Sequence, residues 1–334
     1  MIATRIARFT SLLLLCSAAV VPAAAQVDSD AVNRARAAFI DNMVSKHDFD
    51  RAALGEILAG AQIDQRVLDA ISRPAERVVP WYDYRKIFMN DGRIQGGVAF
   101  WREHADTIAA VAEEHGVDPA MIVAIVGIES LFGQRMGSYR VLDSLSTLAF
   151  AYPRRASFFS SELESFLLMV REEGPQMLEV LGSYAGAMGA GQFIPSSFRA
   201  YAVDADGDGR RDLWQNWADV VASVANYFSV HGWRRGEAAF APAARSAGAV
   251  GGEPENGLTL DSTVGALRTS GYEFETSLAP TAQARALKYE QTADDWEYWV
   301  GFHNYHVITR YNRSEKYALA AFELSQAIER EYRK

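Results

Sequence analysis

The chain has 334 residues, with 42 acidic and 33 basic side chains and a formal net charge of −9. Hydrophobic residues make up 49% of it and aromatic residues 11%, a composition that indicates a folded globular protein and excludes an intrinsically disordered one. The acidic balance argues against nucleic acid as a partner. The length allows two or three modest domains or one large one.

Residues 1–25 have the pattern of a cleaved secretory signal. Arg5 and Arg8 give a basic start, residues 11–21 form an apolar run, and three alanines at 23–25 resemble a cleavage site. The run is short for a transmembrane helix. Cys16, the only cysteine, follows three leucines and not a small residue, so we expect no lipid anchor and no disulfide in the mature chain. Without residues 1–25 the chain would keep 31 basic and 42 acidic residues, a net charge of −11.

Helical periodicity dominates the rest of the chain. The apolar spacing predicts helices over 31–46, 51–58 and 65–71, a turn-rich stretch over 72–81, and helices over 98–114, 119–132, 157–173 and 217–230. Residues 241–257, rich in Ala and Gly, are predicted to be a linker, and residues 258–271 a small unit. A strand is expected at 287–291 and a closing helix at 314–332. The predicted fold class is mainly α with a minor β element (α+β).

Glu129 stands out because it ends the most apolar helical stretch in the chain. Asp118 is a suitable N-cap, Pro119 a suitable first helical residue, and Gly133 a stop. A segment that is apolar on every face predicts a buried central helix. Burial raises the pKa of a carboxyl group, which suits a general acid working near neutrality. The alternative is a structural Glu bonded to an Arg or to a backbone amide.

A second signal is an acidic loop spaced like a calcium-binding EF-hand. Asp204, Asp206, Asp208 and Asp212 occupy loop positions 1, 3, 5 and 9, and the carbonyl of Arg210 occupies position 7. Position 12 is Gln215 where a bidentate Glu is expected, and we expect Asp219 in the next helix to supply the missing ligand. One unpaired loop predicts a single structural Ca²⁺ and not a switch. The alternative is an acidic turn without metal. No organic cofactor is expected.

A third signal is the glycine-dense segment 182–197. Such glycines let the backbone approach a ligand closely, and Ser183 and Gln192 are side chains that hydrogen-bond sugars well. No P-loop ending is present, so phosphate binding is not favoured. A purely structural glycine-rich turn is the alternative. The six histidines show no zinc spacing, and the sequence has no G-x-S-x-G elbow.

Together these segments closely resemble the lytic murein transglycosylase B family (glycoside hydrolase family 103), relatives of goose-type lysozyme that cut bacterial peptidoglycan. The matching residues, in chain order, are Ile125 to Ser130, Ala151 to Ala156, Gly182 to Ser197, the Asp204 loop ending in Asp212-Leu213-Trp214, Ser223 to Phe228 with His231-Gly232-Trp233, and Ile308 to Asn312. They span most of the mature chain, which makes the match specific.

The resemblance implies a lysozyme-like catalytic core with a flanking helical domain, a small β domain and one calcium site. With the helix pattern it gives this map: signal peptide 1–25, N-terminal helical region 26–110, catalytic core 111–240 with the EF-hand-like loop 204–215, linker 241–257, small α/β subdomain 258–300, and a C-terminal segment 301–334 packing on the core. A monomeric, soluble periplasmic enzyme is expected. Its partners would be peptidoglycan glycan strands and other cell-wall enzymes.

The resemblance also implies the chemistry and the sugar contacts. In the family, one Glu, here Glu129, acts first as acid and then as base, giving 1,6-anhydro ends without consuming water. The implied substrate-binding residues are Ser130, Ser183, Gln192, Phe193, Asn226, Tyr227, Asn304 and Tyr311. Core packing is the alternative for each aromatic residue. Two other functions stay open: a lysozyme-type hydrolase that yields reducing ends, and a non-catalytic peptidoglycan-binding protein.

Overall fold

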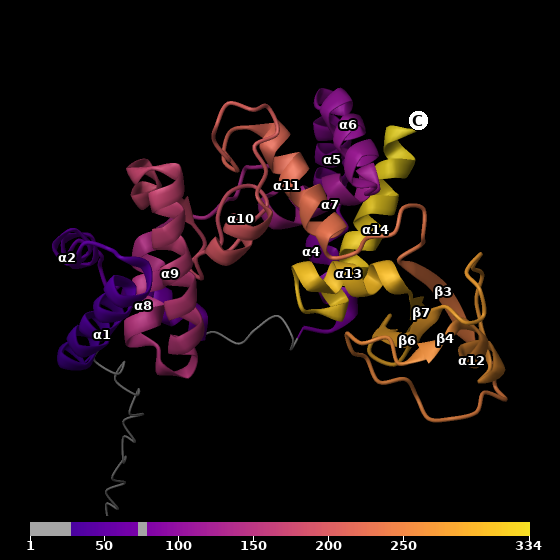
Figure 1. The fold of residues 1–334 in the computed structure, drawn as a ribbon. Helices are drawn as coiled ribbons and strands as arrows, with labels where there is room; N and C mark the ends of the chain where they lie inside the picture. Colours follow the sequence, from indigo (N-terminus) through magenta and orange to yellow (C-terminus); the bar gives the residue numbers. More distant parts are fainter. Residues whose placement is uncertain (1–27, 73–78) are drawn as a thin grey trace, which may run out of the picture.

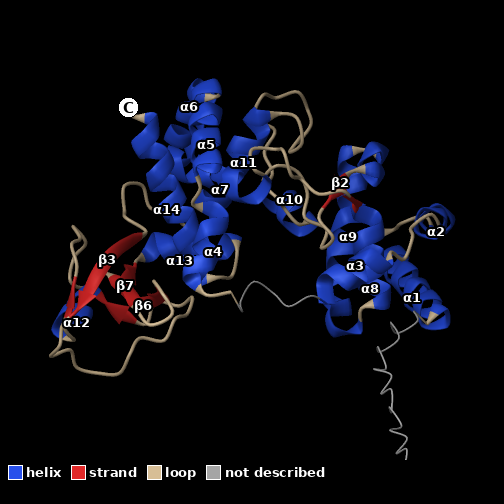
Figure 2. Ribbon diagram, turned by 180° about the vertical axis from the view of Figure 1, so that it is seen from behind, coloured by secondary structure: helices blue, strands red, loops and turns tan. Residues whose placement is uncertain are grey.

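The computed structural model describes residues 28–72 and 79–334, so the predicted signal segment and Cys16 lie outside the described residues. The chain forms three parts, as Figure 1 shows: a helical lobe (α1–α3, α8 and α9), a central core (α4–α7, α11, α13 and α14) and a sheet domain (β3–β7 with α12). Helix α10 packs on α9 of the lobe and on α11 of the core. Figure 2 shows the core between the lobe and the sheet domain. Within the described residues, no helix combines the length and the apolar character needed to cross a lipid bilayer.

The helices are α1 Ser29–His47, α2 Arg51–Ala59, α3 Gln65–Ser72, α4 Trp81–Phe88, α5 Asp91–Glu103, α6 Ala105–His115, α7 Pro119–Ser130, α8 Val141–Ala151, α9 Ala156–Glu173, α10 Pro195–Tyr201, α11 Trp217–Val230, α12 Val264–Thr269, α13 His303–Tyr311 and α14 Glu315–Tyr332. The strands are β1 Tyr139–Arg140, β2 Leu181–Gly182, β3 Phe240–Arg245, β4 Ser262–Thr263, β5 Tyr272–Glu273, β6 Gln283–Glu290 and β7 Trp296–Gly301. The mainly α prediction with a minor β part is therefore confirmed.

The core is built around α7, the apolar helix that ends in Glu129. Asp118 caps it by accepting from the Ala120 N–H at 3.0 Å, and Pro119 occupies its first turn. Residues 120–127 are all buried. Helices α5, α6, α11 and α14 pack against α7, so every face of the helix is covered by protein.

The helical lobe draws on two distant parts of the sequence. Helices α8 and α9 pack against each other, and α1 and α3 pack on α8. The predicted boundary at residue 110 is therefore wrong: α4–α6 belong with the core, whereas α8 and α9, assigned to the catalytic core, belong to the lobe. Side-chain periodicity gives a helix but not the partner that covers its apolar face, which explains the error.

The sheet domain is a five-stranded antiparallel sheet in the order β4-β6-β7-β3-β5, with α12 packed against it. Its strand β3 lies within the stretch predicted to be a linker, so that prediction is wrong for residues 241–245. Pro242 pairs with Trp299 of β7, while β5 pairs with β3 only at Ala244 and Arg245. At Pro242, β3 therefore has a neighbouring strand on one side only. A proline, which has no backbone N–H to donate, is tolerated at such an edge position.

Other helices and strands differ from those that the apolar spacing predicts, at points where that spacing is a weak indicator. The single helix predicted over 98–114 is two helices, α5 and α6, which break at His104 (φ −112°, ψ 25°). The pattern predicts no helix at α4, α8, α10, α12 or α13, and no strand at β1–β5 or β7. The predicted strand at 287–291 is the end of the longer strand β6. Apart from α8 and α13, these helices are eight residues or fewer, which is short for a periodicity signal.

Gly137 should tolerate a side chain poorly. Its φ is +96°, and a Cβ there would lie 2.0 Å from the backbone carbonyl of Gly182, where β1 and β2 pair. We expect Gly137→Ala to destabilise the fold by about 3 kcal/mol, roughly 6–12 °C in melting temperature. Gly55→Ala is the control, because that helical position is open and alanine there should be neutral or stabilising. Equal melting temperatures for the two variants would contradict this account.

Candidate active site

Glu129 lies in the last turn of α7, where the backbone is unusual. Leu131, Phe132 and Gly133 have positive φ values of 51°, 56° and 79°. Ser130 stabilises this turn: its hydroxyl donates to the Val126 carbonyl at 3.2 Å and accepts from the Gly133 N–H at 3.0 Å. Non-glycine residues in this conformation are strained and concentrate at functional sites. The turn ends α7 immediately after Glu129 and leaves that side chain only partly buried.

Tyr317 holds the Glu129 carboxylate. Its hydroxyl donates to Oε1 of Glu129 at 2.6 Å, and Tyr317 itself is 2% exposed. It stands in the first turn of α14, where the Ser314 hydroxyl accepts from the Tyr317 N–H at 3.2 Å. Burial, and then the charge of Glu129, raise the pKa of the Tyr317 phenol well above its usual value. The phenol therefore remains protonated and stays a donor.

Sequence reasoning missed Tyr317. The predicted helix over 314–332 contained it, and the available signal was a tyrosine one turn after a serine cap, followed by the apolar run 318–321. Nothing in that signal gives its partner, which is 188 residues earlier in the chain.

Tyr311 connects α13 to the glycine-rich segment. Its hydroxyl donates to the Gly191 carbonyl at 2.7 Å. Burial raises the pKa of Tyr311 well above its usual value, and the charge of Glu129 adds to the shift. The ring centroid of Tyr311 is 4.7 Å from that of Tyr227 and 5.8 Å from that of Phe193. The three predicted aromatic residues thus form one cluster beside Glu129.

Within this cluster the rings differ in exposure. Phe193 is 2% exposed and Tyr227 8% exposed. The Tyr227 hydroxyl donates to the Arg310 carbonyl at 2.5 Å, and burial raises its pKa to about 12. Phe193 and Tyr227 are therefore buried members of the cluster, and Tyr311 is the residue of the three that is partly exposed.

The polar residues predicted to bind sugar in the glycine-rich segment shape its backbone. The Ser183 hydroxyl accepts from the Ala185 and Ala187 N–H groups at 3.2 and 3.0 Å. Gln192 has a φ of +52°, and its side-chain amide donates to the Met136 and Gly189 carbonyls at 3.2 and 2.9 Å. Both side chains are partly buried. Gln192 also connects this segment to the turn that follows α7.

Two of the predicted substrate-binding residues, Asn304 and Ser130, are buried and bonded to backbone groups. Asn304 is 0% exposed, and its side chain makes three hydrogen bonds, to the N–H and carbonyl of Arg234 and to the carbonyl of Glu237. Ser130 is 1% exposed, and its hydroxyl is bonded to backbone on both sides. Each side chain therefore has a structural role. Asn226 is partly buried and donates to the Tyr201 carbonyl at 2.9 Å.

A wide cleft of about 1510 Å³ opens beside the site. Its lining residues include Tyr139 of β1, Tyr152 directly after α8, Tyr184 of the glycine-rich segment and Trp296 of the sheet domain. Residues 312–316, which are the turn after α13 and the first two residues of α14, also line it, and Tyr317 follows them directly. Glu129 is not itself a lining residue of this cleft; it is connected to the cleft through Tyr317, which follows the lining residue Lys316 and bonds Glu129.

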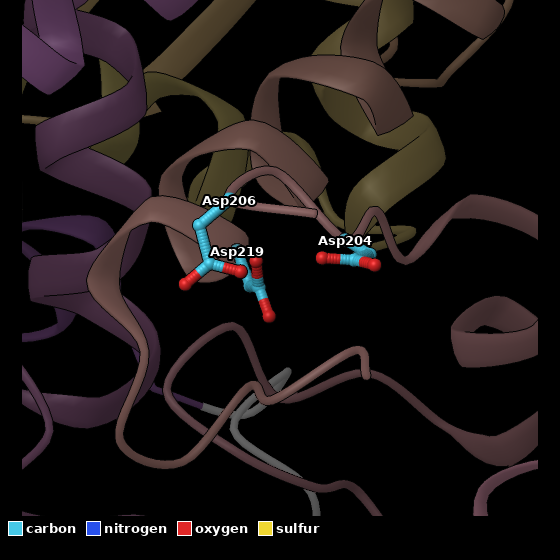
Figure 3. A group of neighbouring side chains, drawn as sticks. All are labelled: Asp204, Asp206 and Asp219. Carbon is cyan, nitrogen blue, oxygen red and sulfur yellow. The ribbon is translucent and has the colours of Figure 1, made fainter. Parts of the chain in front are cut away.

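The acidic loop precedes α11 and brings three carboxylates together. One oxygen each of Asp204, Asp206 and Asp219 lie within 4.8 Å of one another, and Figure 3 shows Asp206 and Asp219 side by side with Asp204 across from them. The Asp204 carboxylate accepts from the N–H groups of Gly207, Asp208 and Gly209 at 2.8–3.1 Å, which folds the loop tightly. Hard oxygen donors gathered in this way suit Ca²⁺.

Asp219 is the buried member of this trio. It is 0% exposed, and it accepts from the N–H groups of Ala205 and Asp212 at 2.8 Å each. Burial raises the pKa of Asp219, the two backbone bonds oppose that shift, and the charges of Asp206 and Asp204 add to it. A cation would offset this crowding of like charges. Asp208 and Asp212 are outside the trio: their carboxylates accept from the N–H of Arg210 and from those of Trp214 and Gln215.

Comparison with known proteins gives consistent matches over nearly the whole chain. A family model described as the Transglycosylase SLT domain matches residues 31–326. The membrane-bound lytic murein transglycosylase B of Escherichia coli (strain K12) is 42% identical over 313 residues, covering 91% of this chain and 85% of that protein. The catenated lytic transglycosylase SltB1 from Pseudomonas aeruginosa has a TM-score of 0.83 and 44% identity, covering 89% of this chain and 97% of that one.

Two further solved structures were determined with ligands. The Escherichia coli lytic transglycosylase Slt35, in complex with calcium, has a TM-score of 0.80 and 41% identity, covering 90% of this chain and 94% of that one. SltB3 from Pseudomonas aeruginosa, in complex with NAG-NAM-pentapeptide, has a TM-score of 0.78 and 30% identity, covering 90% of this chain and 80% of that one.

Proposed function

Because the chain belongs to the Transglycosylase SLT domain family, we propose that it is a peptidoglycan lytic transglycosylase in which Glu129 is the catalytic acid and base. The observation that carries this proposal is the partly buried Glu129 carboxylate, held at 2.6 Å by a buried tyrosine that directly follows the cleft-lining residue Lys316. A carboxylate fixed in this way has the geometry that proton transfer requires.

The proposed reaction uses one carboxyl group twice. Protonated Glu129 donates to the glycosidic oxygen between N-acetylmuramic acid and N-acetylglucosamine, and the bond from that oxygen to C1 breaks. Ionised Glu129 then takes the proton from the muramyl 6-hydroxyl, whose oxygen bonds to C1 and closes the 1,6-anhydro ring. Glu129 is protonated again at the end, and no water is consumed. Tyr317 keeps the carboxyl group oriented through both steps.

Removal of the acid tests the assignment of Glu129. We expect Glu129→Gln to lower lysis of purified sacculi by at least about 10⁴-fold, since acid–base roles are worth ~10²–10⁴-fold each and the amide can perform neither step. The melting temperature should stay near that of wild type. Glu103→Gln, an exposed acid at the end of α5, is the matched control and should be fully active.

Mass spectrometry of the wild-type digest decides between the candidate reactions. Products ending in 1,6-anhydro-muramic acid support the proposal. Reducing ends would show a lysozyme-type hydrolase, and intact sacculi a binding protein.

Tyr317→Phe tests the positioning of the carboxylate. A hydrogen bond to a charged group contributes about 1.5–3 kcal/mol, so we expect kcat to fall about 10–100-fold. Tyr289→Phe is the control, because it also deletes a buried phenol, one that donates to the Glu315 carbonyl at 3.1 Å. If both variants lose the same activity, the effect of Tyr317 is general destabilisation and not positioning.

We also propose that the Asp204 loop binds one structural Ca²⁺ through Asp204, Asp206 and Asp219. Their oxygens lie within 4.8 Å of one another, and the related Slt35 structure was solved in complex with calcium. Asp208, Asp212 and the Arg210 carbonyl would complete the shell by the loop spacing. Gln215 in place of a bidentate Glu favours weak binding, with a Kd of ~10⁻⁴–10⁻³ M.

Thermal melts in chelator and in excess calcium test this site. Ligand at a hundredfold excess over Kd stabilises the folded state by about 2.7 kcal/mol, which should raise the melting temperature by roughly 5–10 °C. The increase should vanish in the double variant Asp204→Asn plus Asp206→Asn and persist in Asp294→Asn, an exposed acid at the β6–β7 turn. An unchanged melting temperature for wild type would rule out the metal site.

The proposed location is the periplasm, with export through a cleaved signal over residues 1–25. The support is the sequence pattern alone, since these residues are outside those described. The Escherichia coli relative is named membrane-bound, whereas the position of Cys16 after three leucines favours a form without a lipid anchor here.

A further inference from the structure

Another pocket, called here the junction pocket, lies where the sheet domain joins the core. Its volume is about 460 Å³, within the ~300–1,000 Å³ range of small-molecule sites. Its walls come from residues 281–283 at the start of β6, residues 259–260 ahead of β4, the first turn of α13, and Arg234, which follows α11. It shares no lining residue with the wide cleft. A ligand in it would therefore contact the core and the sheet domain together, away from the proposed glycan site.

The lining of the junction pocket complements negative charge. It has three residues that can carry positive charge and three neutral hydrogen-bond donors: Arg234, His303 and His306, and Thr259, Thr281 and Gln283. The other two lining residues are apolar, so within the described chain no carboxylate lines this pocket. The guanidinium of Arg234 would repel a metal cation, whereas an anion is attracted by all three charged groups.

Each of the two histidines has one ring nitrogen fixed and the other available. Nε2 of His303 lies 2.8 Å from the Gly232 carbonyl oxygen, and Nδ1 of His306 lies 2.8 Å from that of Leu258. Because a carbonyl only accepts, the bonded nitrogen must carry a proton. The second nitrogen of each ring has no hydrogen bond to any residue that the structure describes. Protonation turns that nitrogen into a donor without breaking the existing bond, so each ring can offer an N–H to an anion.

Two ion pairs adjoin the junction pocket. Nη1 of Arg234 lies 3.4 Å from Oε2 of Glu237, and the Arg234 side chain is 54% exposed. Arg285 donates to the Thr259 carbonyl at 2.8 Å and pairs with Asp261 at 2.8 Å. A guanidinium has five N–H donors, and charge-assisted hydrogen bonds are ordinarily ~2.7–2.9 Å long. The single long contact with Glu237 therefore leaves most donors of Arg234 for a second anion.

We propose that the junction pocket binds the phosphate group of a small organic molecule. Donors from separate elements can surround a tetrahedral dianion, whereas a planar carboxylate is bound by one guanidinium through two parallel N–H bonds. The volume leaves room for the rest of the molecule beside its phosphate. Helix α13 runs from this pocket to Tyr311, whose hydroxyl donates to the Gly191 carbonyl. The ligand would therefore stabilise the helix that contacts the glycine-rich segment at its other end.

Isothermal titration calorimetry at fixed ionic strength tests this site without using the glycan reaction. The probes are inorganic phosphate, glucose 6-phosphate, glucose, acetate and sulfate. Glucose 6-phosphate tests for room beside the phosphate, glucose lacks the anion, and acetate is the carboxylate alternative. Sulfate stays a dianion at pH 6 and at pH 8, so its affinity at the two pH values reports on the charge of the protein and not on that of the probe.

Three variants remove the proposed contacts one at a time: Arg234→Gln, His303→Gln and His306→Asn. A glutamine amide can replace Nε2 of a histidine, and an asparagine amide can replace Nδ1. The bonds to the backbone carbonyls can therefore persist while the second ring nitrogen is lost. Arg330→Gln is the control of equal charge change, an exposed arginine in the last turn of α14 that does not line the pocket.

We expect glucose 6-phosphate to bind wild type at least as tightly as inorganic phosphate, and glucose not to bind. Sulfate should bind about tenfold more tightly at pH 6 than at pH 8, since histidine gains its positive charge over this range. Each pocket variant should weaken phosphate binding about three- to tenfold, as expected for one partly exposed charged contact. Arg330→Gln should bind like wild type.

Four results would each overturn this inference and leave the proposed function intact. They are an absence of saturable phosphate and sulfate binding to wild type, an affinity unchanged in Arg234→Gln, and acetate binding as tightly as phosphate, which would assign a carboxylate ligand. The fourth is binding of inorganic phosphate without binding of glucose 6-phosphate, which would show a site for the bare ion only.

Discussion

The structure depends on the need to cover α7 on all sides. A helix that is apolar on every face is stable only when protein surrounds it, and residues 120–127 are all buried. Burying this surface stabilises the fold by about 25 cal/mol per Å² of apolar area. The final helix, α14, is one of the elements that cover it. The packing that stabilises α7 therefore also brings Tyr317 to Glu129.

Next to the tightly packed helix α7, the site contains backbone conformations that non-glycine residues rarely adopt. The turn after Glu129 has two non-glycine residues with positive φ, and Gln192 in the glycine-rich segment is a third. Gln192 donates to Met136, and Tyr311 donates to Gly191, so hydrogen bonds connect the strained segments to each other and to α13. Such strain persists only where the surrounding structure enforces it. Positions of this kind are consistent with a site that needs fixed geometry.

The acidic loop stabilises the structure at a distance from the chemistry. Asp219, at the start of α11, bonds the backbone on both sides of the loop, at Ala205 and Asp212. The same helix packs on α6 and α7 and supplies Tyr227 to the aromatic cluster. A cation in the loop would therefore stabilise the first turn of a helix that packs beneath the proposed active site, without touching substrate.

The sequence by itself determined the local features. Periodicity and caps placed α7, α9 and α11 to within two residues, and the carboxylate spacing located the acidic loop, because these signals depend on neighbours a few residues apart. Only the tertiary structure decided which distant groups meet. It paired Glu129 with Tyr317, buried Asn304 and Ser130, joined α1–α3 to α8, and made a strand from part of a predicted linker. Those outcomes depend on which apolar face covers which, and no short stretch of sequence carries that information.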